Sequence, residues 1–344
     1  MIQPHIPPVL SPEVETFFRD AIVIDAINPS RWGDPGLFQS AKAGGLTAAN
    51  ITVAIWEDFT TTLANIMEWL EWFERYRECI TPVRTAGELL AAKQDGRIGI
   101  ILGFQNAAPI ENNLRRLLLF YKLGVRIIQL TYNDRNLLGD GCYEPRDGGL
   151  TRFGREAVRE MNHLGILIDL SHVGDRTAQE VVEYSEDPVA FTHVNARSQH
   201  DHPRNKPDDL LQPLVEKGGV VGANSFPLFF ARGFDSTLDD YLDSIDYLVS
   251  LIGIDHVGIG TDFCMGQPSA WFRWIFSAYG VFPPKHAPQV PEPYRHLHGL
   301  RGMEEYRNIA AGLLARGHKP DDVRKILGGN WLRLFAAVWK ERDR

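Results

Sequence analysis

The chain has 344 residues, of which 44% are hydrophobic and 23% charged, and its net charge is -8 at pH 7. This length allows either two ordinary domains or one large α/β barrel. The acidic balance and the absence of a long basic run argue against nucleic acid or an anionic membrane surface as partners. A small neutral or zwitterionic ligand fits this composition better.

Cysteine usage and the N-terminal segment bear on the cellular compartment. Cys79, Cys142 and Cys264 are far apart and odd in number, so we expect neither a disulfide framework nor a paired-cysteine metal site. The N-terminus lacks the basic start and apolar stretch of a signal peptide, and no run of about 18 apolar residues occurs. These features predict a cytoplasmic protein with no membrane association.

Short runs rich in Val, Ile and Leu recur along the chain without polar alternation, which is typical of parallel strands buried on both faces. They predict strands at residues 21–25, 51–56, 98–104, 125–131, 165–171, 188–193, 219–225 and 256–262. Helical spacing between them predicts helices at residues 112–124, 151–165, 175–185 and 237–253. Several of these helical segments end in glycine, as a helix with a left-handed C-cap does.

Strands that alternate with helices in this way predict one (β/α)8 barrel, a TIM barrel, over residues 1–344. A doubly wound open sheet is the alternative architecture. That fold favours a glycine-rich phosphate loop after the first strand, and "DAINPSRW" at this place is not one.

Two segments follow the eighth predicted strand. Residues 264–300 carry the aromatic residues Trp271, Phe272, Trp274 and Phe276 and then a proline-rich stretch, so we expect a lid or interface insertion, or else an aromatic cluster beneath a long loop. Residues 319–344 predict two amphipathic helices that pack on the outside of the barrel.

Catalytic residues of such barrels collect where the strands end, at their C-terminal side. The polar or aromatic residues at the predicted strand ends are Asp25, Trp56, Glu57, Gln105, Asn106, Tyr132, Asn133, His172, His193, Asn224 and Asp262. His172 and His193 follow consecutive strands, and imidazole is the commonest nitrogen ligand of zinc, so we interpret them as metal ligands. The alternative is that each is only a hydrogen-bonded polar residue.

Two further residues are candidates for the chemistry. Asp262 in "GIGTD" is placed to act as a general base towards water or as another metal ligand, and a loop cap is the alternative. Arg204 in "HPRNKPDD" offers a bidentate fork to a substrate carboxylate, although an arginine on a loop is often only solvated. Pro207 and Asp208 are start signals for the helix that follows.

The most specific stretches of the sequence are residues 123–174, "PVAFTHVNAR" (188–197), "PRNKPDD" (203–209), "VGIGTDF" (257–263) and "GGNWLRLF" (328–335). With these motifs the chain resembles the renal, or membrane, dipeptidases, the M19 metallopeptidases of the amidohydrolase superfamily, from about residue 20 to 340. The resemblance implies a (β/α)8 barrel that hydrolyses dipeptides with two zinc ions. It is also the only ground on which we expect a homodimer.

Carried over by position, the resemblance implies that His172 and His193 bind the second metal. It makes Arg204 the residue that grips the substrate carboxylate and Asp262 the acid/base. We add Trp56 and Asn133, which end the second and fourth predicted strands, to the substrate-binding set.

The sequence departs from the family pattern at five positions. Ile27 and Pro29 stand where the family has the His-x-Asp pair of the first metal, and Gln105 replaces the bridging glutamate. Tyr132 replaces the histidine expected at the oxyanion, and Cys264 stands where many members have a second aspartate. Ile and Pro offer no donor atom, and an amide lacks the charge of a carboxylate, so we expect one zinc ion, not two.

We therefore predict a dipeptidase-like metallohydrolase that cleaves an amide bond of a small substrate with one zinc ion or an altered metal site. Gln105 joins His172 and His193 as a metal ligand, and Tyr132 donates a hydrogen bond to the oxyanion. The alternative is a catalytically inactive or metal-free protein that binds a small ligand on the same fold. A weaker hypothesis is an aromatic cage for a cationic amine, built from Trp32, Trp56, Tyr132, Trp271 and Trp274.

Overall fold

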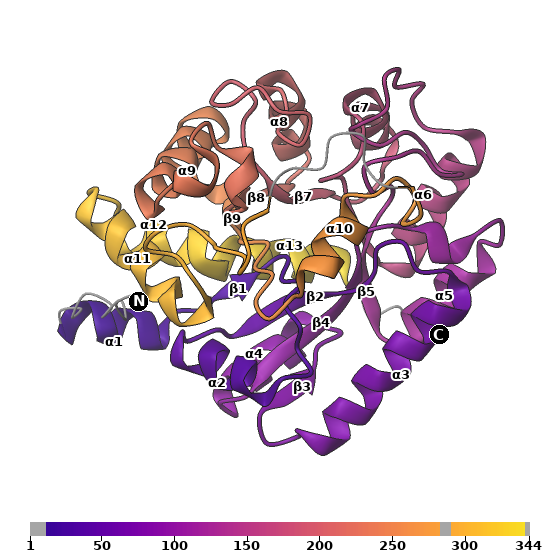
Figure 1. The fold of residues 1–344 in the computed structure, drawn as a ribbon. Coiled ribbons are helices and arrows are strands. Elements are labelled where there is room, and N and C mark those ends of the chain that lie inside the picture. The colour runs from indigo at the N-terminus through magenta and orange to yellow at the C-terminus, as the bar shows by residue number, and fades with distance from the viewer. Residues whose placement is uncertain (1–11, 283–289, 341–344) are drawn as a thin grey trace.

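The computed structural model describes residues 12–282 and 290–340. Its centre is a ring of eight parallel strands, with helices around it (Figure 1). The ring closes because β1 pairs with both β2 and β9, while β2 also pairs with β4. The strands are β1 (Ile24–Asp25), β2 (Ala48–Ala54), β4 (Ile98–Phe104), β5 (Val125–Gln129), β6 (Leu167–Asp169), β7 (Ala190–Val194), β8 (Val220–Asn224) and β9 (Val257–Gly260). The predicted (β/α)8 barrel is confirmed.

Helices lie around the ring and at its two ends, and they connect its strands. They are α1 (Pro12–Asp20), α2 (Pro35–Ala43), α3 (Phe59–Arg75), α4 (Ala86–Gln94), α5 (Arg115–Lys122), α6 (Arg152–Leu164), α7 (Asp175–Tyr184), α8 (Asp208–Glu216), α9 (Leu238–Ile252), α10 (Ser269–Ile275), α11 (Tyr306–Ala315), α12 (Pro320–Arg324) and α13 (Asn330–Val338). The four helices predicted between strands correspond to α5, α6, α7 and α9. Their apolar faces pack against the outward residues of the strands in one continuous core.

Local sequence signals set several helix ends. Thr237 and Asp240 form a capping box at the start of α9. Gly165 ends α6 with φ 74°, the left-handed conformation expected of a C-terminal glycine. Helix α8 begins at Asp208, directly after Pro207, as the sequence predicts.

The strands differ from the prediction at several places, and most of them are shorter than predicted, as β1 (Ile24–Asp25) is against residues 21–25. The short strand β3 (Ile80–Pro82) was not predicted and pairs with the first half of β4, beside the place where β5 pairs with the second half. Strand β2 begins at Ala48, three residues before its predicted start. The prediction missed these residues because "AAN" contains no β-branched residue, which would favour a strand. Both β2 and β3 depend on hydrogen bonds to β4, and the local sequence does not show this pairing.

The C-terminal helix closes the N-terminal end of the ring and does not pack on the outer wall, which corrects the prediction for its position (Figure 1). Trp331 and Phe335 on α13 pack against inward residues at the starts of the strands, among them Ile24 and Leu167. The indole N–H of Trp331 donates to the Ile259 carbonyl at 3.0 Å. Helix α13 can pack this closely only if the strand residue that faces Trp331 is small. A Cβ on Gly258 would lie 2.2 Å from the Trp331 ring.

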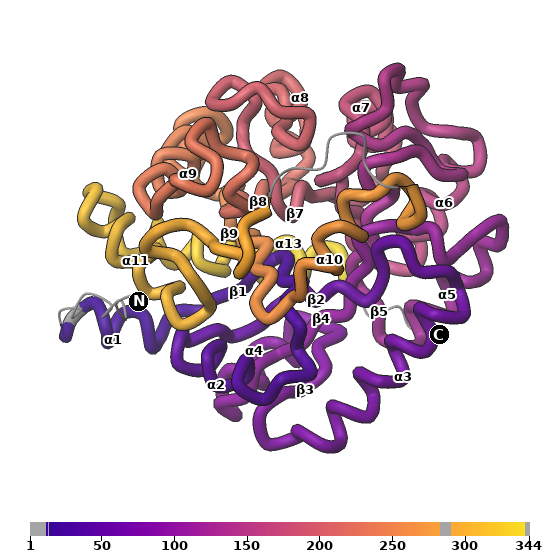
Figure 2. Tube along the Cα trace, in the orientation of Figure 1, coloured from indigo at the N-terminus to yellow at the C-terminus, as the bar shows by residue number. Residues whose placement is uncertain are grey.

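The opposite end of the ring carries the segment after β9, which crosses its opening as α10 (Figure 2). Residues 283–289 of the predicted insertion lie outside the described residues, as do residues 341–344 of the C-terminal segment. In the part of the chain that is described, every helix is too short or too polar to cross a membrane.

Candidate active site

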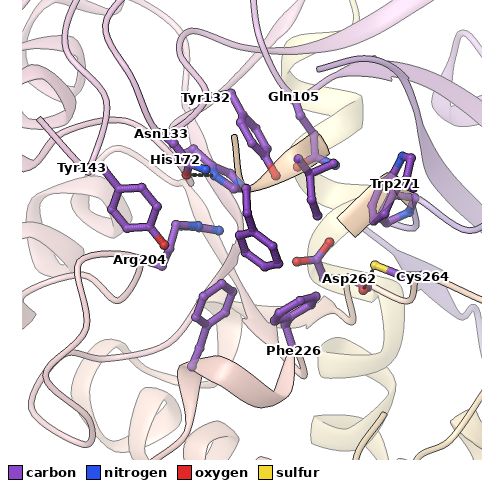
Figure 3. A pocket seen from close by; sticks show the side chains of 14 residues that line it. Gln105, Tyr132, Asn133, Tyr143, His172, Arg204, Phe226, Asp262, Cys264 and Trp271 are labelled. Carbon is purple, nitrogen blue, oxygen red and sulfur yellow. Dashed lines mark hydrogen bonds between the residues drawn. The ribbon is translucent and has the colours of Figure 1, made fainter. Parts of the chain in front are cut away.

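A small pocket lies at the C-terminal ends of the strands, beneath α10 (Figure 3). Its free volume is about 20 Å³, which is room for about one water molecule. It is lined by Pro29, Gln105, Tyr132, Asn133, Tyr143, His172, Arg204, Phe226, Phe229, Asp262, Cys264, Trp271, Ile275 and Phe276. A ligand larger than water therefore enters only if part of this wall moves.

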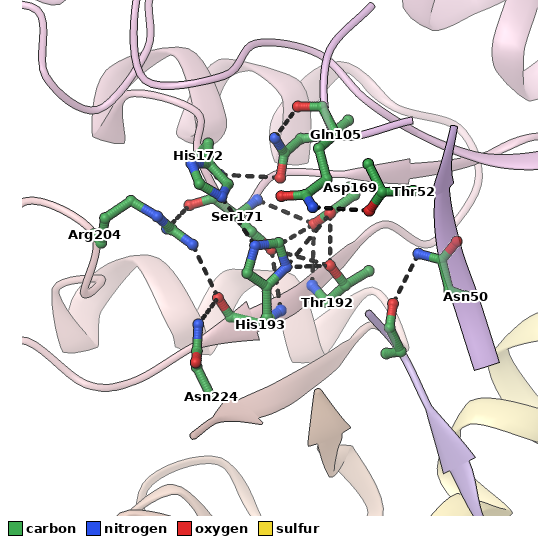
Figure 4. A network of polar contacts seen from close by, with 12 residues as sticks. Asn50, Thr52, Gln105, Asp169, Ser171, His172, Thr192, His193, Arg204 and Asn224 are labelled. Atoms are coloured by element: carbon green, nitrogen blue, oxygen red, sulfur yellow. Dashed lines mark hydrogen bonds and ion pairs between the residues drawn. The ribbon is translucent and has the colours of Figure 1, made fainter. Parts of the chain in front are cut away.

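The two predicted metal ligands meet at this end of the barrel. His172 lies just after β6, His193 lies in β7, and their Nε2 atoms are 3.0 Å apart (Figure 4). Both side chains are buried, with 4% and 0% of their surface exposed. The adjacent strand ends thus bring the imidazoles together, as the sequence predicts.

The proton of His172 is held on the far side of its ring. Nδ1 of His172 is 2.7 Å from Oδ1 of Asn133. The same amide oxygen accepts a hydrogen bond from the Cys142 thiol, with Sγ 3.7 Å away. Because an amide oxygen only accepts, Nδ1 carries the proton and Nε2 has a free lone pair. Asn133 has φ 58°, a left-handed conformation that asparagine adopts more readily than most residues.

His193 is oriented in the same way by a hydroxyl. The Thr192 hydroxyl donates to Asp169 at 2.6 Å and lies 2.7 Å from Nδ1 of His193. Since its single proton is used on Asp169, the hydroxyl accepts from Nδ1–H, which leaves Nε2 with a lone pair. Asp169 accepts four hydrogen bonds, from the N–H and hydroxyl of both Ser171 and Thr192. Burial raises the pKa of Asp169 above its usual value, and these four hydrogen bonds oppose that rise by favouring the ionised carboxylate.

The two Nε2 atoms therefore face each other as acceptors, an arrangement that is favourable only with a cation between them. Burial, reinforced by the positive charge of Arg204, lowers the pKa of both imidazoles well below the usual histidine value. A proton therefore binds only weakly between the two Nε2 atoms. Two neutral imidazoles, each fixed by a partner on its other nitrogen, fit a divalent metal ion.

Gln105 lies beside the histidine pair (Figure 4). Its amide nitrogen donates to the Thr52 hydroxyl at 2.8 Å, which leaves the amide oxygen as the atom able to reach a metal. Within residues 12–282 and 290–340, no three His, Cys, Asp or Glu side chains converge as a metal site. The candidate ligands are therefore His172, His193 and the Gln105 oxygen, because Asp262 does not converge with the two histidines as a third ligand.

Asp262 follows β9 and faces the pocket with 8% of its surface exposed. Its φ of 58° is a strained conformation of the kind that persists at functional sites. Burial raises the pKa of Asp262 to about 7, against the opposing effects of Arg204 and Asn224. A carboxyl with a pKa near neutrality both accepts and releases a proton at physiological pH.

Arg204 is a buried cation, with 1% of its surface exposed. Its guanidinium donates to the carbonyl oxygens of Ser171 and His193, while its Nε has no hydrogen-bond partner. It also lies over the Phe229 ring at 5.1 Å. No described acidic side chain forms an ion pair with it, so an anionic ligand would offset the cost of burying this charge.

Tyr132 directs its hydroxyl into the pocket, and its ring stacks on His172 at 4.1 Å between centroids (Figure 3). Burial, together with the charge of Asp262, raises the pKa of Tyr132 well above its usual value. The hydroxyl therefore stays protonated and remains a donor. Trp56 lies outside the pocket wall and packs edge-on against Tyr132 at 5.2 Å, so its contact with substrate stays a prediction.

Ile27 and Pro29, in the loop after β1, supply no metal donor side chain. Ile27 is buried and holds the backbone N–H of Asp262 through its carbonyl at 3.1 Å, and Pro29 lines the pocket. Asp25 lies away from the pocket, where it accepts hydrogen bonds from Thr261, Tyr306 and Asn28. Its role is to tie β1 to β9 and α11.

Several site residues escaped the sequence reasoning. Tyr143, Phe226, Phe229 and Ile275 line the pocket, and so does Phe276, which the sequence analysis assigns only to the predicted insertion. "SFPLFFA" after the seventh predicted strand was the available signal for the two phenylalanines at 226 and 229. The polar residues that break the apolar runs in "IDLSH" and "FTH", namely Asp169, Ser171 and Thr192, likewise mark the network that orients His193.

Comparison with known proteins finds proteins named as dipeptidases among the relatives of this chain. The model of the membrane dipeptidase family, peptidase family M19, matches residues 35–271. Dipeptidase verJ of Clonostachys rogersoniana is 32% identical over 271 residues, which is 77% of this chain and 62% of that protein. Dipeptidase aclJ of Aspergillus oryzae is 34% identical over 247 residues, 71% of this chain and 52% of that protein. The chain thus spans less than two thirds of these relatives.

Solved structures agree in fold. An amidohydrolase from Pseudomonas aeruginosa is 40% identical, with a TM-score of 0.91 over 95% of this chain and 99% of that one. A metallopeptidase from Rhodobacter sphaeroides, with a phosphinate mimic of L-Ala-D-Ala bound, is 24% identical, with a TM-score of 0.76 over 93% and 100% of the two chains. The family match extends over more than half of the sequence, and this chain therefore belongs to the membrane dipeptidase family, peptidase family M19.

Proposed function

We propose that the chain is a dipeptidase-like metallohydrolase that cleaves the peptide or amide bond of a small substrate with one zinc ion. The observation that carries the proposal is the pair of Nε2 atoms 3.0 Å apart, in the same site as a buried arginine that forms no ion pair with any acidic side chain of the described residues. The first group fits a metal and the second fits a substrate carboxylate. Family membership supports the reaction class.

His172, His193 and Gln105 would hold the zinc ion, with a position left open for water or substrate. Zinc bound there supplies a Lewis acid that polarises a carbonyl and lowers the pKa of water. With only these three protein ligands, a site for a second ion lacks donors, because Ile27 and Pro29 replace the side chains that would bind it.

The remaining residues hold the substrate and move protons. Asp262, with its pKa near 7, takes the proton from the attacking water and returns it to the leaving amine. Arg204 binds the free carboxylate of the substrate, and the Tyr132 hydroxyl donates to the oxyanion. Asn133 uses its oxygen on His172, which leaves its amide N–H groups for the substrate. Trp56 supports the ring of Tyr132.

The test compares a dipeptide with its C-terminal amide, in the wild-type protein and in Arg204→Ala. We expect Arg204→Ala to raise KM for the free dipeptide at least tenfold and to change KM for the amide less than twofold. Equal effects on both substrates would contradict the role of Arg204.

Two measurements test the metal. We expect the purified protein to hold about one zinc ion per chain and to lose turnover when the zinc is removed by a chelator. If the purified protein holds no zinc and hydrolyses no dipeptide, it is the inactive ligand-binding protein of the alternative hypothesis. The cytoplasmic location and the homodimer stay predictions.

A further inference from the structure

A second and much larger cavity lies across the loop that follows β1. Its volume is about 750 Å³, within the range of small-molecule binding sites. The loop after β1, the end of β2 and one face of α3 form its walls, and we call it the α3 cleft. It is distinct from the pocket beneath α10, because the two cavities share no lining residue.

Helix α3 contributes most of the cleft. The residues it directs there recur every three or four positions and continue just past its end, namely Asn65, Glu68, Trp69, Trp72, Arg75 and Tyr76. Trp69 and Trp72 form an edge-on pair with ring centroids 4.8 Å apart. The indole of Trp72 is only half-buried, so it offers an aromatic surface to a ligand.

The cleft carries charges of both signs that are not used in ion pairs. Arg31 and Arg75 supply positive charge, and Asp34 and Glu68 supply negative charge. All four are exposed, and none forms an ion pair within residues 12–282 and 290–340. Asp34 instead caps α2 by accepting from the Gly36 N–H at 2.9 Å. Glu68 is therefore the free carboxylate of the cleft, two helical turns from the Arg75 guanidinium.

Only a thin partition separates the α3 cleft from the pocket. Pro29 lines the pocket, while the next residue, Ser30, lines the cleft and bonds to Phe263 O at 2.9 Å. Thr52 lines the cleft on the other side of the partition and accepts from Gln105, which lines the pocket. The hydroxyl proton of Thr52 makes no hydrogen bond within the described chain, so it is available to a ligand.

We infer that the α3 cleft is a second binding site, whose ligand is a short zwitterionic peptide of two or three residues. Its ammonium group lies against Glu68, its carboxylate against Arg75, and an apolar side chain over Trp72. Glu68 and Arg75 are seven positions apart, about 10 Å along the helix, and three extended residues span about the same length. The inference goes beyond the proposed hydrolysis, because it concerns binding outside the pocket.

The test is calorimetric titration of the protein with the tripeptide Gly-Leu-Gly, up to about 10 mM, in the presence of a chelator that prevents turnover. Arg204→Ala is titrated in parallel, because it removes carboxylate binding in the pocket and leaves the cleft intact. We expect one binding event that persists in Arg204→Ala. We expect N-acetylation or C-terminal amidation of the peptide to raise its Kd at least fivefold. Binding lost in Arg204→Ala, or no binding at all, would overturn the inference.

Substitutions then place the ligand in the cleft. We expect Glu68→Gln and Arg75→Ala each to weaken binding of Gly-Leu-Gly at least fivefold in the Arg204→Ala background. The matched controls are Glu74→Gln on the same helix and Arg77→Ala just after it, which lie outside the cleft lining, and both should leave the affinity unchanged. Trp72→Phe should reduce the quenching of tryptophan fluorescence by the peptide. Equal effects of test and control variants would show that the peptide binds elsewhere. The hydrolytic proposal would survive that result, because its assay depends on Arg204 and on metal.

Discussion

Nε2 of His172 faces Nε2 of His193 at 3.0 Å, and each presents a lone pair because Asn133 and Thr192 hold the proton on the opposite ring nitrogen. The proposed cation site therefore depends on the partners of the imidazoles as much as on the imidazoles themselves. If either partner is lost, the ring can turn or change tautomer, and the lone pair is no longer fixed in position.

Asn133→Gly tests this orientation. Glycine accepts the φ of 58° without strain, so the change removes the acceptor of His172 Nδ1–H and leaves the backbone in place. We expect zinc affinity to fall about 10- to 100-fold, as for other lost partners of metal-binding histidines. Competition with a chromophoric chelator measures it. Asn112→Gly, at an exposed position, is the control and should bind zinc like the wild type. An unchanged affinity in Asn133→Gly would mean that Asn133 does not orient the ring.

Gln105→Glu tests the third ligand. The substitution restores the carboxylate that the family resemblance implies here and adds a negative charge next to two neutral imidazoles. We expect zinc affinity to rise at least tenfold, because a carboxylate binds the ion more strongly than an amide oxygen. Gln105→Leu has similar bulk and no donor atom, so it should bind zinc more weakly than the wild type. If the three proteins bind zinc equally, Gln105 is not a ligand.

The sequence predicted the barrel because parallel strands buried on both faces leave continuous apolar runs such as "IGIILGF", which became β4. It also predicted that His172 and His193 meet, since adjacent strand ends share one opening. It missed β3, a strand of three residues that is too short to leave an apolar run, and the position of α13 at the N-terminal end of the ring, where an amphipathic pattern alone does not distinguish a plug from an outer helix.

The polar partners at the site were harder to predict for a related reason. Nothing in "TYND" shows that the oxygen of Asn133 reaches His172, because the contact joins residues 39 positions apart. The burial of Arg204 was equally hidden, since a loop arginine is usually solvated, and only its contacts with Ser171 and His193 carbonyls reveal a cation enclosed by backbone. Such contacts depend on how the loops fold over the barrel end.

Tyr132→Phe tests the oxyanion donor. Phenylalanine keeps the ring stacked on His172 and the contact with Trp56 but removes the hydroxyl. We expect kcat for dipeptide hydrolysis to fall about 10- to 100-fold with little change in KM, because the hydrogen bond forms mainly in the transition state. Zinc content should stay at the wild-type level. A variant with unchanged kcat, or one that loses zinc, would contradict this role.

Asp262→Asn tests the buried carboxyl through stability instead of activity. The folded-state pKa of about 7 is raised above the value near 4 of an unfolded aspartate. Its contribution to stability is therefore complete below pH 4 and is lost as the pH rises towards 7, because ionisation is easier in the unfolded chain. Asparagine does not ionise and avoids this loss. Between pH 5 and 8 we expect the variant to gain about 2–3 kcal/mol in unfolding free energy relative to the wild type.

Urea denaturation with chelator present measures this gain at each pH. The control is Asp201→Asn, at an exposed position, which should show almost no gain over this pH range. A difference that does not grow with pH would mean that Asp262 is ionised in the folded protein well below neutrality, and it would then be a poor proton donor to the leaving amine.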